Sequence, residues 1–132
     1  MEYHRLVLQF FKRTDNSVET LIDSFEKEYQ VQTPQQLTRL ISSTDNFVDI
    51  PIPQNIVFKY VFVISEFNGA DTAAGVLEGD PAPIVVRRDN ENIDLPLTDG
   101  FIALTGSIHQ LKVSTPYAST TNKIKVTVFL GG

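Results

Sequence analysis

The residues that could perform acid–base or metal chemistry are few and scattered. The two histidines, His4 and His109, lie far apart, and neither belongs to a His-x-His or His-Glu-x-x-His pattern that would bring two imidazoles to one metal. The sequence has no cysteine, which excludes thiolate nucleophiles, Cys-based zinc sites and disulfides. We therefore expect no metal and no cofactor, and we interpret His109 as an ordinary strand residue.

The hydroxyl and carboxylate groups give no catalytic pattern either. Ser107 lies in Gly106-Ser-Ile-His109, without the Gly-x-Ser-x-Gly elbow of serine hydrolases. Glu78 and Asp80 are flanked by glycine and proline, which indicates an exposed loop where carboxylates are solvated. The sequence predicts a protein that is not an enzyme.

Two polar loops could contact a ligand. The segment Asp89–Asp94 places oxygen ligands at alternate positions, but it lacks the glycine and the downstream glutamate of a calcium loop. Tyr117 lies on a Ser/Thr-rich loop, where aromatic residues often contact sugars or partner proteins. The alternative is that Tyr117 pins this loop to the core, so a glycan on these loops is a secondary hypothesis.

The charge balance disfavours polyanionic partners. Sixteen acidic against eleven basic residues give a net charge of −5, which opposes attraction to nucleic acid and to anionic membranes. The pairs Arg87/Arg88 and Lys123/Lys125 are too small to reverse this and are interpreted as solvated strand faces. Since no apolar run approaches membrane-spanning length and residues 1–8 do not resemble a signal peptide, we expect a soluble protein made in the cytoplasm.

The elements that would position any site are organised around residues 55–67. This is the most apolar run of the chain, and its β-branched and aromatic residues indicate a strand. With period two, Phe58, Tyr60 and Phe62 lie on one face, while Val61 and Val63 lie on the other. We expect Phe62 in the core. A strand that is apolar on both faces must be covered twice, and the second cover is the functional question.

The N-terminal segment predicts a strand followed by helices. Residues 4–12 alternate as a strand, and residues 33–43 begin with a Thr-Pro helix start and predict a short helix. Between them the apolar residues have helical spacing and predict a helix over 17–29: Val18, Leu21, Ile22, Phe25 and Tyr29. The alternative is a hairpin whose return strand runs through Thr20 and Ile22.

From Phe47 onward the signals are almost wholly β. The proline-marked segment 47–53 suits a sheet edge, and Gly106 predicts a bend within 101–113. Further strands are expected at 84–87, 92–95 and 123–130, with Ile124, Val126, Val128 and Leu130 inward. We predict a mainly β, single-domain protein over residues 1–132, with an antiparallel β-sandwich or jelly roll at 47–132 and an N-terminal strand with a helical elaboration at 1–46.

The C-terminal half resembles a known class of proteins. Asn92-Ile-Asp-Leu-Pro-Leu-Thr-Asp-Gly-Phe-Ile-Ala-Leu-Thr-Gly106, then Ile108–Val113, a Ser/Thr-rich loop and a last strand, look like the small all-β virion proteins of bacteriophages. Those include jelly-roll vertex, capsid, decoration and appendage-base proteins. The resemblance implies a structural subunit that assembles in a symmetric particle, with itself and other virion proteins as partners and the virion as its location.

The residues support an assembly role independently. Candidate contact residues are those that leave apolar or basic side chains outside one small sandwich, namely Phe129, Lys123, Lys125, Val57, Val61, Val63 and Tyr117. We expect a homo-oligomer. Two alternatives stay open: a carbohydrate- or receptor-binding module on the same sandwich, and a monomer in which the N-terminal helices cover the second apolar face.

Overall fold

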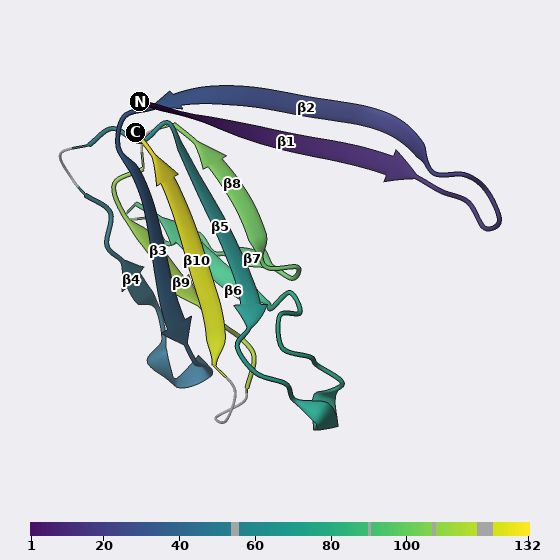
Figure 1. Ribbon diagram of the computed structural model, residues 1–132. Coiled ribbons are helices and arrows are strands. Elements are labelled where there is room, and N and C mark those ends of the chain that lie inside the picture. Colours follow the sequence, from purple (N-terminus) through teal and green to yellow (C-terminus); the bar gives the residue numbers. More distant parts are fainter. Residues whose placement is uncertain (54–55, 90, 107, 119–122) are drawn as a thin grey trace.

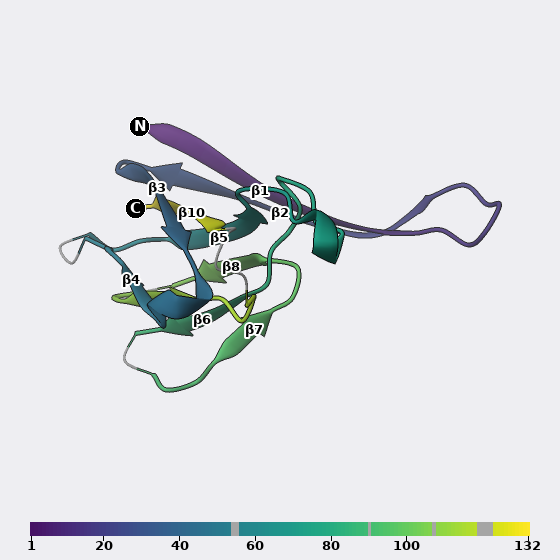
Figure 2. The same cartoon turned by 90° about the horizontal axis from the view of Figure 1, so that it is seen from below.

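The computed structural model, which describes residues 1–53, 56–89, 91–106, 108–118 and 123–132, is mainly β. Every strand pair is antiparallel. Two four-stranded sheets pack face to face, and a separate two-stranded hairpin leaves them (Figures 1 and 2). The predicted antiparallel sheets are confirmed, whereas the predicted N-terminal helices are wrong.

The two sheets of the sandwich interleave strands from all along the chain. The sheet nearer the hairpin, called here the near sheet, has the order β3 (Pro34–Ile41), β10 (Ile124–Gly131), β5 (Tyr60–Phe67), β8 (Phe101–Thr105). The far sheet has the order β4 (Val48–Ile50), β9 (Leu111–Ser114), β6 (Ile84–Arg88), β7 (Leu95–Leu97). Short 3-10 turns at Ser43–Asp45 and Thr72–Ala74 are the helical elements of the described residues.

The sandwich begins earlier than residue 47, because the segment predicted as a second helix is strand β3. Its ladder with β10 runs from Pro34 opposite Gly131 to Ile41 opposite Ile124. Pro34 starts an edge strand, a position that tolerates the missing amide donor as well as a helix start does. The amide of Thr33 donates to the carbonyl of Gly132 at 2.9 Å instead of entering a helix.

The core lies between the two sheets. The predicted inward residues of β10 are confirmed, since Ile124, Val126, Val128 and Leu130 are all at most 1% exposed. On β5 the buried residues are Val61, Val63, Ser65 and Phe67, which face the far sheet. The placement of Phe62 in this core is wrong, because the strand alternates and Phe62 lies on the opposite, outer face.

The N-terminal residues form one long hairpin. Strands β1 (Glu2–Lys12) and β2 (Thr20–Val31) pair from Glu2 opposite Val31 to Lys12 opposite Thr20, with a bulge after Phe10. The helix expected over 17–29 is wrong, and the alternative hairpin is confirmed. Ser17 closes the turn of the hairpin by donating its amide to the carbonyl of Thr14 at 3.0 Å.

This hairpin, residues 2–31, is called the arm. Its root lies over the outer face of the near sheet, and the rest runs across the strands and beyond the β8 side of the sandwich (Figures 1 and 2). Most of its side chains are exposed on both faces of the hairpin. The arm therefore forms a third layer over only part of the near sheet.

Candidate functional site

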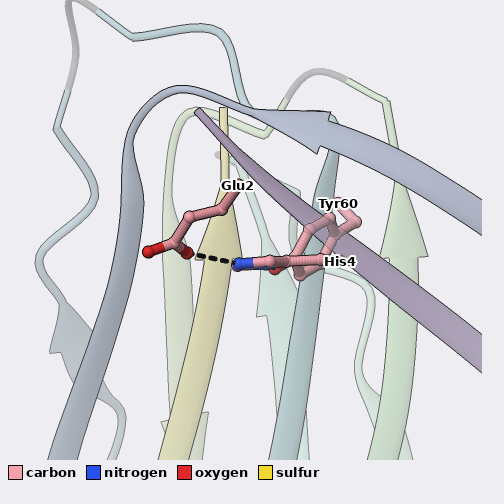
Figure 3. Close-up of polar contacts among 3 residues, drawn as sticks. All are labelled: Glu2, His4 and Tyr60. Atoms are coloured by element: carbon pink, nitrogen blue, oxygen red, sulfur yellow. Dashed lines mark hydrogen bonds and ion pairs between the residues drawn. The ribbon is translucent and has the colours of Figure 1, made fainter.

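The root of the arm is held by a small polar and aromatic cluster on β5. The His4 Nδ1 atom hydrogen-bonds the Tyr60 hydroxyl, and its Nε2 atom lies 2.8 Å from a carboxylate oxygen of Glu2 (Figure 3). The ring of Tyr29, opposite His4 in the hairpin, lies with its centroid 5.2 Å from that of Tyr60. We call these four residues the seat.

One tautomer of neutral His4 satisfies both of its polar contacts in the seat. With its proton on Nε2, neutral His4 donates to Glu2 and accepts from the Tyr60 hydroxyl, so each polar atom has a partner. Burial, and next the negative charge of Glu2, raise the pKa of the Tyr60 phenol above its ordinary value. Tyr60 thus stays a neutral donor throughout the physiological range.

Backbone contacts also anchor the root. The Gly132 carbonyl accepts hydrogen bonds from the amides of Gln32 and Thr33, at 2.7 and 2.9 Å. The Lys59 ammonium donates to the carbonyl of Gln30, and Val31 is fully buried. The arm is thus tied to the sandwich at its root.

An apolar groove opens between the arm and the near sheet. Its volume is about 320 Å³. The arm contributes His4, Leu6 and Tyr29, and the sheet contributes residues of β5, β8 and β10, among them Phe62 and Phe129. The groove therefore joins the underside of the arm, the face that carries His4 and Tyr29, to the outer face of the sheet.

Beyond the groove, the underside of the arm has nothing beneath it among the described residues. Leu8 pairs with Phe25 on this face, and Phe10 follows on the same side. Their exposed fractions are 56, 54 and 64%. These exposed side chains share the face with two charged residues, because Lys27 pairs with Leu6 and Asp23 pairs with Phe10.

The outer face of the near sheet carries further apolar side chains that extend from the groove towards the end away from the seat. Phe62 touches both Phe101 and Phe129, with ring centroids 5.6 and 6.0 Å apart. Phe101 is nevertheless 46% exposed and Leu40 is 43% exposed. The monomer alternative is thus wrong in its detail, because Val18 and Leu21 lie exposed on the arm and do not cover these side chains.

The predicted contact residues fall into two groups. Phe129 lies outward on β10 as predicted, half-buried beside the seat, and Lys125, further along the same face, pairs with Glu66 at 2.6 Å. Lys123 is exposed just before β10, and Val57 is 75% exposed in the segment before β5. Val61 and Val63 must be reassigned, because both are fully buried against the far sheet and are core residues.

The two polar loops are engaged within the chain. Tyr117 is half-buried, its ring packs edge-on to Phe67 with centroids 4.8 Å apart, and its hydroxyl donates to Asp71. In the Asp89–Asp94 loop, of which residue 90 lies outside the described residues, Asp94 pairs with Arg87. Asp89 accepts from the amides of His109 and Gln110.

Over the described residues there is no group of three or more His, Cys, Asp or Glu side chains placed to hold a metal ion, and Ser107 lies outside those residues. Within the same residues, no helix is long and apolar enough to cross a membrane. No family model, curated protein or solved structure matches this chain.

The seat was missed by sequence reasoning. His4 was assessed only as a metal ligand, and its partners Tyr29 and Tyr60 are distant in sequence. The alternation of His4, Leu6, Leu8 and Phe10 along β1 did carry the signal of a one-sided apolar strand. The alternation along β1 does not reveal that β2 returns beside this strand.

Proposed function

We propose that the protein is a structural subunit of a virus particle, in a capsid, vertex, decoration or appendage base, and that it acts through protein–protein assembly. The arm carries this proposal. A sandwich with a core of its own projects a hairpin whose underside exposes Leu8, Phe10 and Phe25, and a neighbouring subunit that covers these side chains would stabilise it.

The strand order of the sandwich supports a jelly roll. When strands β3 to β10 are lettered B to I in chain order, the near sheet becomes B-I-D-G and the far sheet C-H-E-F. This is the arrangement of an eight-stranded jelly roll built from two Greek keys, a fold used by viral capsid proteins, lectins and cupins. The jelly-roll fold supports a virion role by analogy with capsid proteins, and the exposed side chains of the arm support assembly directly.

The residue that suggested glycan binding, Tyr117, is engaged within its own chain. Tyr117 is bound to Phe67 and Asp71 of its own chain, so it serves loop packing. The two carboxylates flanking the other candidate loop are likewise occupied by Arg87 and by backbone amides. We therefore place the partners of this protein among copies of itself and other virion proteins.

Two measurements test this function. Light scattering on the full chain at about 1 to 100 μM, which is at and above a Kd of about 1 μM, should show an oligomer or larger assembly. The double variant Phe10→Asp/Phe25→Asp should lower the assembled mass while keeping the wild-type circular dichroism spectrum. Mass spectrometry of particles purified from a culture that produces this chain should detect it. A wild type that is monomeric and absent from particles would refute the proposal.

A further inference from the structure

Strand β8 presents an open sheet edge. Among the described residues it pairs with β5 on one side and with nothing on the other. Its sequence, Phe101-Ile-Ala-Leu-Thr105, contains neither proline nor a charged residue. Open edges of this kind readily pair with another strand, and most proteins block them.

The other three sheet edges are blocked in the ways that proteins commonly use. β3 begins at Pro34 and carries Arg39. β4 is only Val48–Ile50 with Asp49 at its centre, and β7 is the three residues Leu-Pro-Leu around Pro96. The edge that lacks these features is β8, the one over which the arm projects (Figure 1).

The free hydrogen-bonding groups of β8 can be assigned from the ladder with β5. The Ser65 amide donates to the Gly100 carbonyl at 2.7 Å. Since the bonded and outward-pointing residues alternate in an antiparallel pair, Ile102 and Leu104 bond β5. The amide and carbonyl groups of Phe101, Ala103 and Thr105 therefore point to the open edge.

We propose that β8 pairs antiparallel with β8 of a second copy across a two-fold axis at Ala103, a proposal that rests on the assembly function above and names its partner. Ala103 then faces Ala103 of the other copy, and Phe101 faces the other Thr105. Residues near a two-fold axis meet their own counterparts, so a charged strand would repel itself. An uncharged strand is what this pairing requires.

The arm position fits the same two-fold axis. The arm crosses its own sheet at the end where Thr105 lies, since the groove beneath it includes Ala103, Leu104 and Thr105. Antiparallel pairing places Phe101 of the second copy next to this end. The arm would thus continue over the exposed Phe101 patch of the partner, and the partner's arm would cover the equivalent patch here.

The dimensions agree with this arrangement. The six residue-to-residue steps from His4 to Phe10 span about 20 Å in a strand, whereas three strand spacings, from β5 across the axis to β5 of the second copy, span about 14 Å. Leu8, Phe10 and Phe25 would therefore lie above the partner's β8 and β5. These are the strands that carry Phe101 and Phe62.

Three exposed rings supply part of the apolar area that a stable dimer needs. The rings of Phe10, Phe25 and Phe101 are 64, 54 and 46% exposed, which for aromatic side chains that bury roughly 200 Å² each amounts to about 330 Å² per copy. A standard interface buries about 800 Å² per partner. These three rings alone supply about two fifths of that area, and the continuous sheet adds main-chain hydrogen bonds.

The absence of cysteine permits a direct test on the full-length protein. Ala103→Cys should give a disulfide-linked dimer under mild oxidation, because residues facing each other in an antiparallel pair have Cα atoms about 5.5 Å apart, within the range that a disulfide spans. Thr38→Cys is the matched control, since Thr38 is also an exposed, outer-face residue at the centre of an edge strand of this sheet. It should remain reduced.

The outcomes separate the two proposals. Cross-linking at position 103 at least tenfold faster than at position 38, abolished by Phe10→Asp/Phe25→Asp, supports the arm-clasped dimer. Equal rates at both positions, or no dimer from Ala103→Cys, overturn it. If the wild type is nevertheless oligomeric and present in particles, the assembly function stands and only this dimer geometry fails. If the cross-linked dimer forms but the protein is absent from particles, the dimer geometry stands and the virion function fails.

Discussion

Gly100 occupies a turn that closes directly onto the core. Its φ is +65°, and a Cβ atom there would overlap the Ser65 hydroxyl and the Ala82 carbonyl. Ser65 is itself buried, and its hydroxyl donates to that carbonyl at 2.6 Å. The neighbours of Gly100 therefore cannot give way without losing a buried hydrogen bond.

Gly100→Ala should lower the free energy of unfolding by about 2–4 kcal/mol, combining left-handed backbone strain with overpacking. Gly75→Ala is the control, because Gly75 has a similar φ of +71° with open space around it. It should cost only the strain, about 1 kcal/mol. Urea unfolding of the two variants measures both values, and equal losses would contradict the packing argument.

Asp89 ties the end of β6 to the loop before β9. Its carboxylate accepts from the His109 amide at 2.7 Å and from the Gln110 amide at 3.3 Å. The first of these bonds is the main reason that the pKa of Asp89 is lowered. Because the folded pKa lies below the unfolded one, the stabilisation is present above the unfolded value and is lost as pH falls through the folded value.

Asp89→Asn should therefore be less stable than the wild type at neutral pH, by an amount that is constant above about pH 4 and shrinks as the pH falls further. Urea unfolding of both proteins between pH 7 and pH 2 measures the gap. A gap that widens towards low pH would show that the carboxylate does not bind these amides.

At the scale of elements, the seat depends on a close approach between β5 and the end of β10. The Tyr60 ring lies against Gly131, where a Cβ atom would overlap it. This contact presents the hydroxyl to His4. One ring thus connects the sandwich to the arm.

Tyr60 should titrate late. Burial and the Glu2 charge raise its pKa above the ordinary 10.0, so the stabilisation of the seat by the phenol is complete below pH 10 and is lost as pH rises through the raised pKa. The difference in tyrosinate absorbance between the wild type and Tyr60→Phe should show a midpoint above 10. This subtraction isolates Tyr60 from Tyr117, whose pKa is also raised, first by its hydrogen bond to Asp71. A midpoint at or below 10 would argue against the seat.

The elements differ in how far the sequence could predict them. β10 was predictable because its apolar residues, Ile124 to Leu130, alternate strictly and its polar ones exclude a helix. β2 was ambiguous, since residues such as Leu21, Ile22 and Phe25 suit either a helix or a strand. These residues form a strand because they pair with β1, and local spacing does not encode this contact between residues distant in sequence.

The central strand shows the same limit for packing. Both faces of β5 are apolar, so periodicity correctly separated Phe62 from Val63 but could not say which face was inside. The structure buries the smaller valines between the sheets and leaves the aromatic face for the arm and the proposed partner. The sequence thus predicts that a second layer covers β5, but only the fold shows that this layer lies on the aromatic face.

For the whole molecule, the proposed dimer makes unfolding depend on concentration. The net charge of −5 opposes association over long distances, so in the proposed dimer the contact comes from the uncharged β8 edge and the exposed Leu8, Phe10 and Phe25 of the arm. Because unfolding of a dimer releases two chains, each tenfold dilution removes about 1.4 kcal/mol per dimer from the folded state. A protein that unfolds as a monomer shows no such dependence.

The wild-type thermal midpoint should therefore rise by roughly 2–4 °C for each tenfold increase in protein concentration, the shift expected for about 0.7 kcal/mol per chain of this size. Phe10→Asp/Phe25→Asp should unfold at one temperature at all concentrations, because carboxylates would be buried unpaired at the contact. Val7→Asp is the control: Val7 is on the opposite face of β1 from Leu8 and is 42% exposed, so its substitution should keep the wild-type slope. A wild-type midpoint independent of concentration between 1 and 100 μM, a range spanning about two tenfold steps around common dimer affinities, would show that the arm does not clasp a second copy.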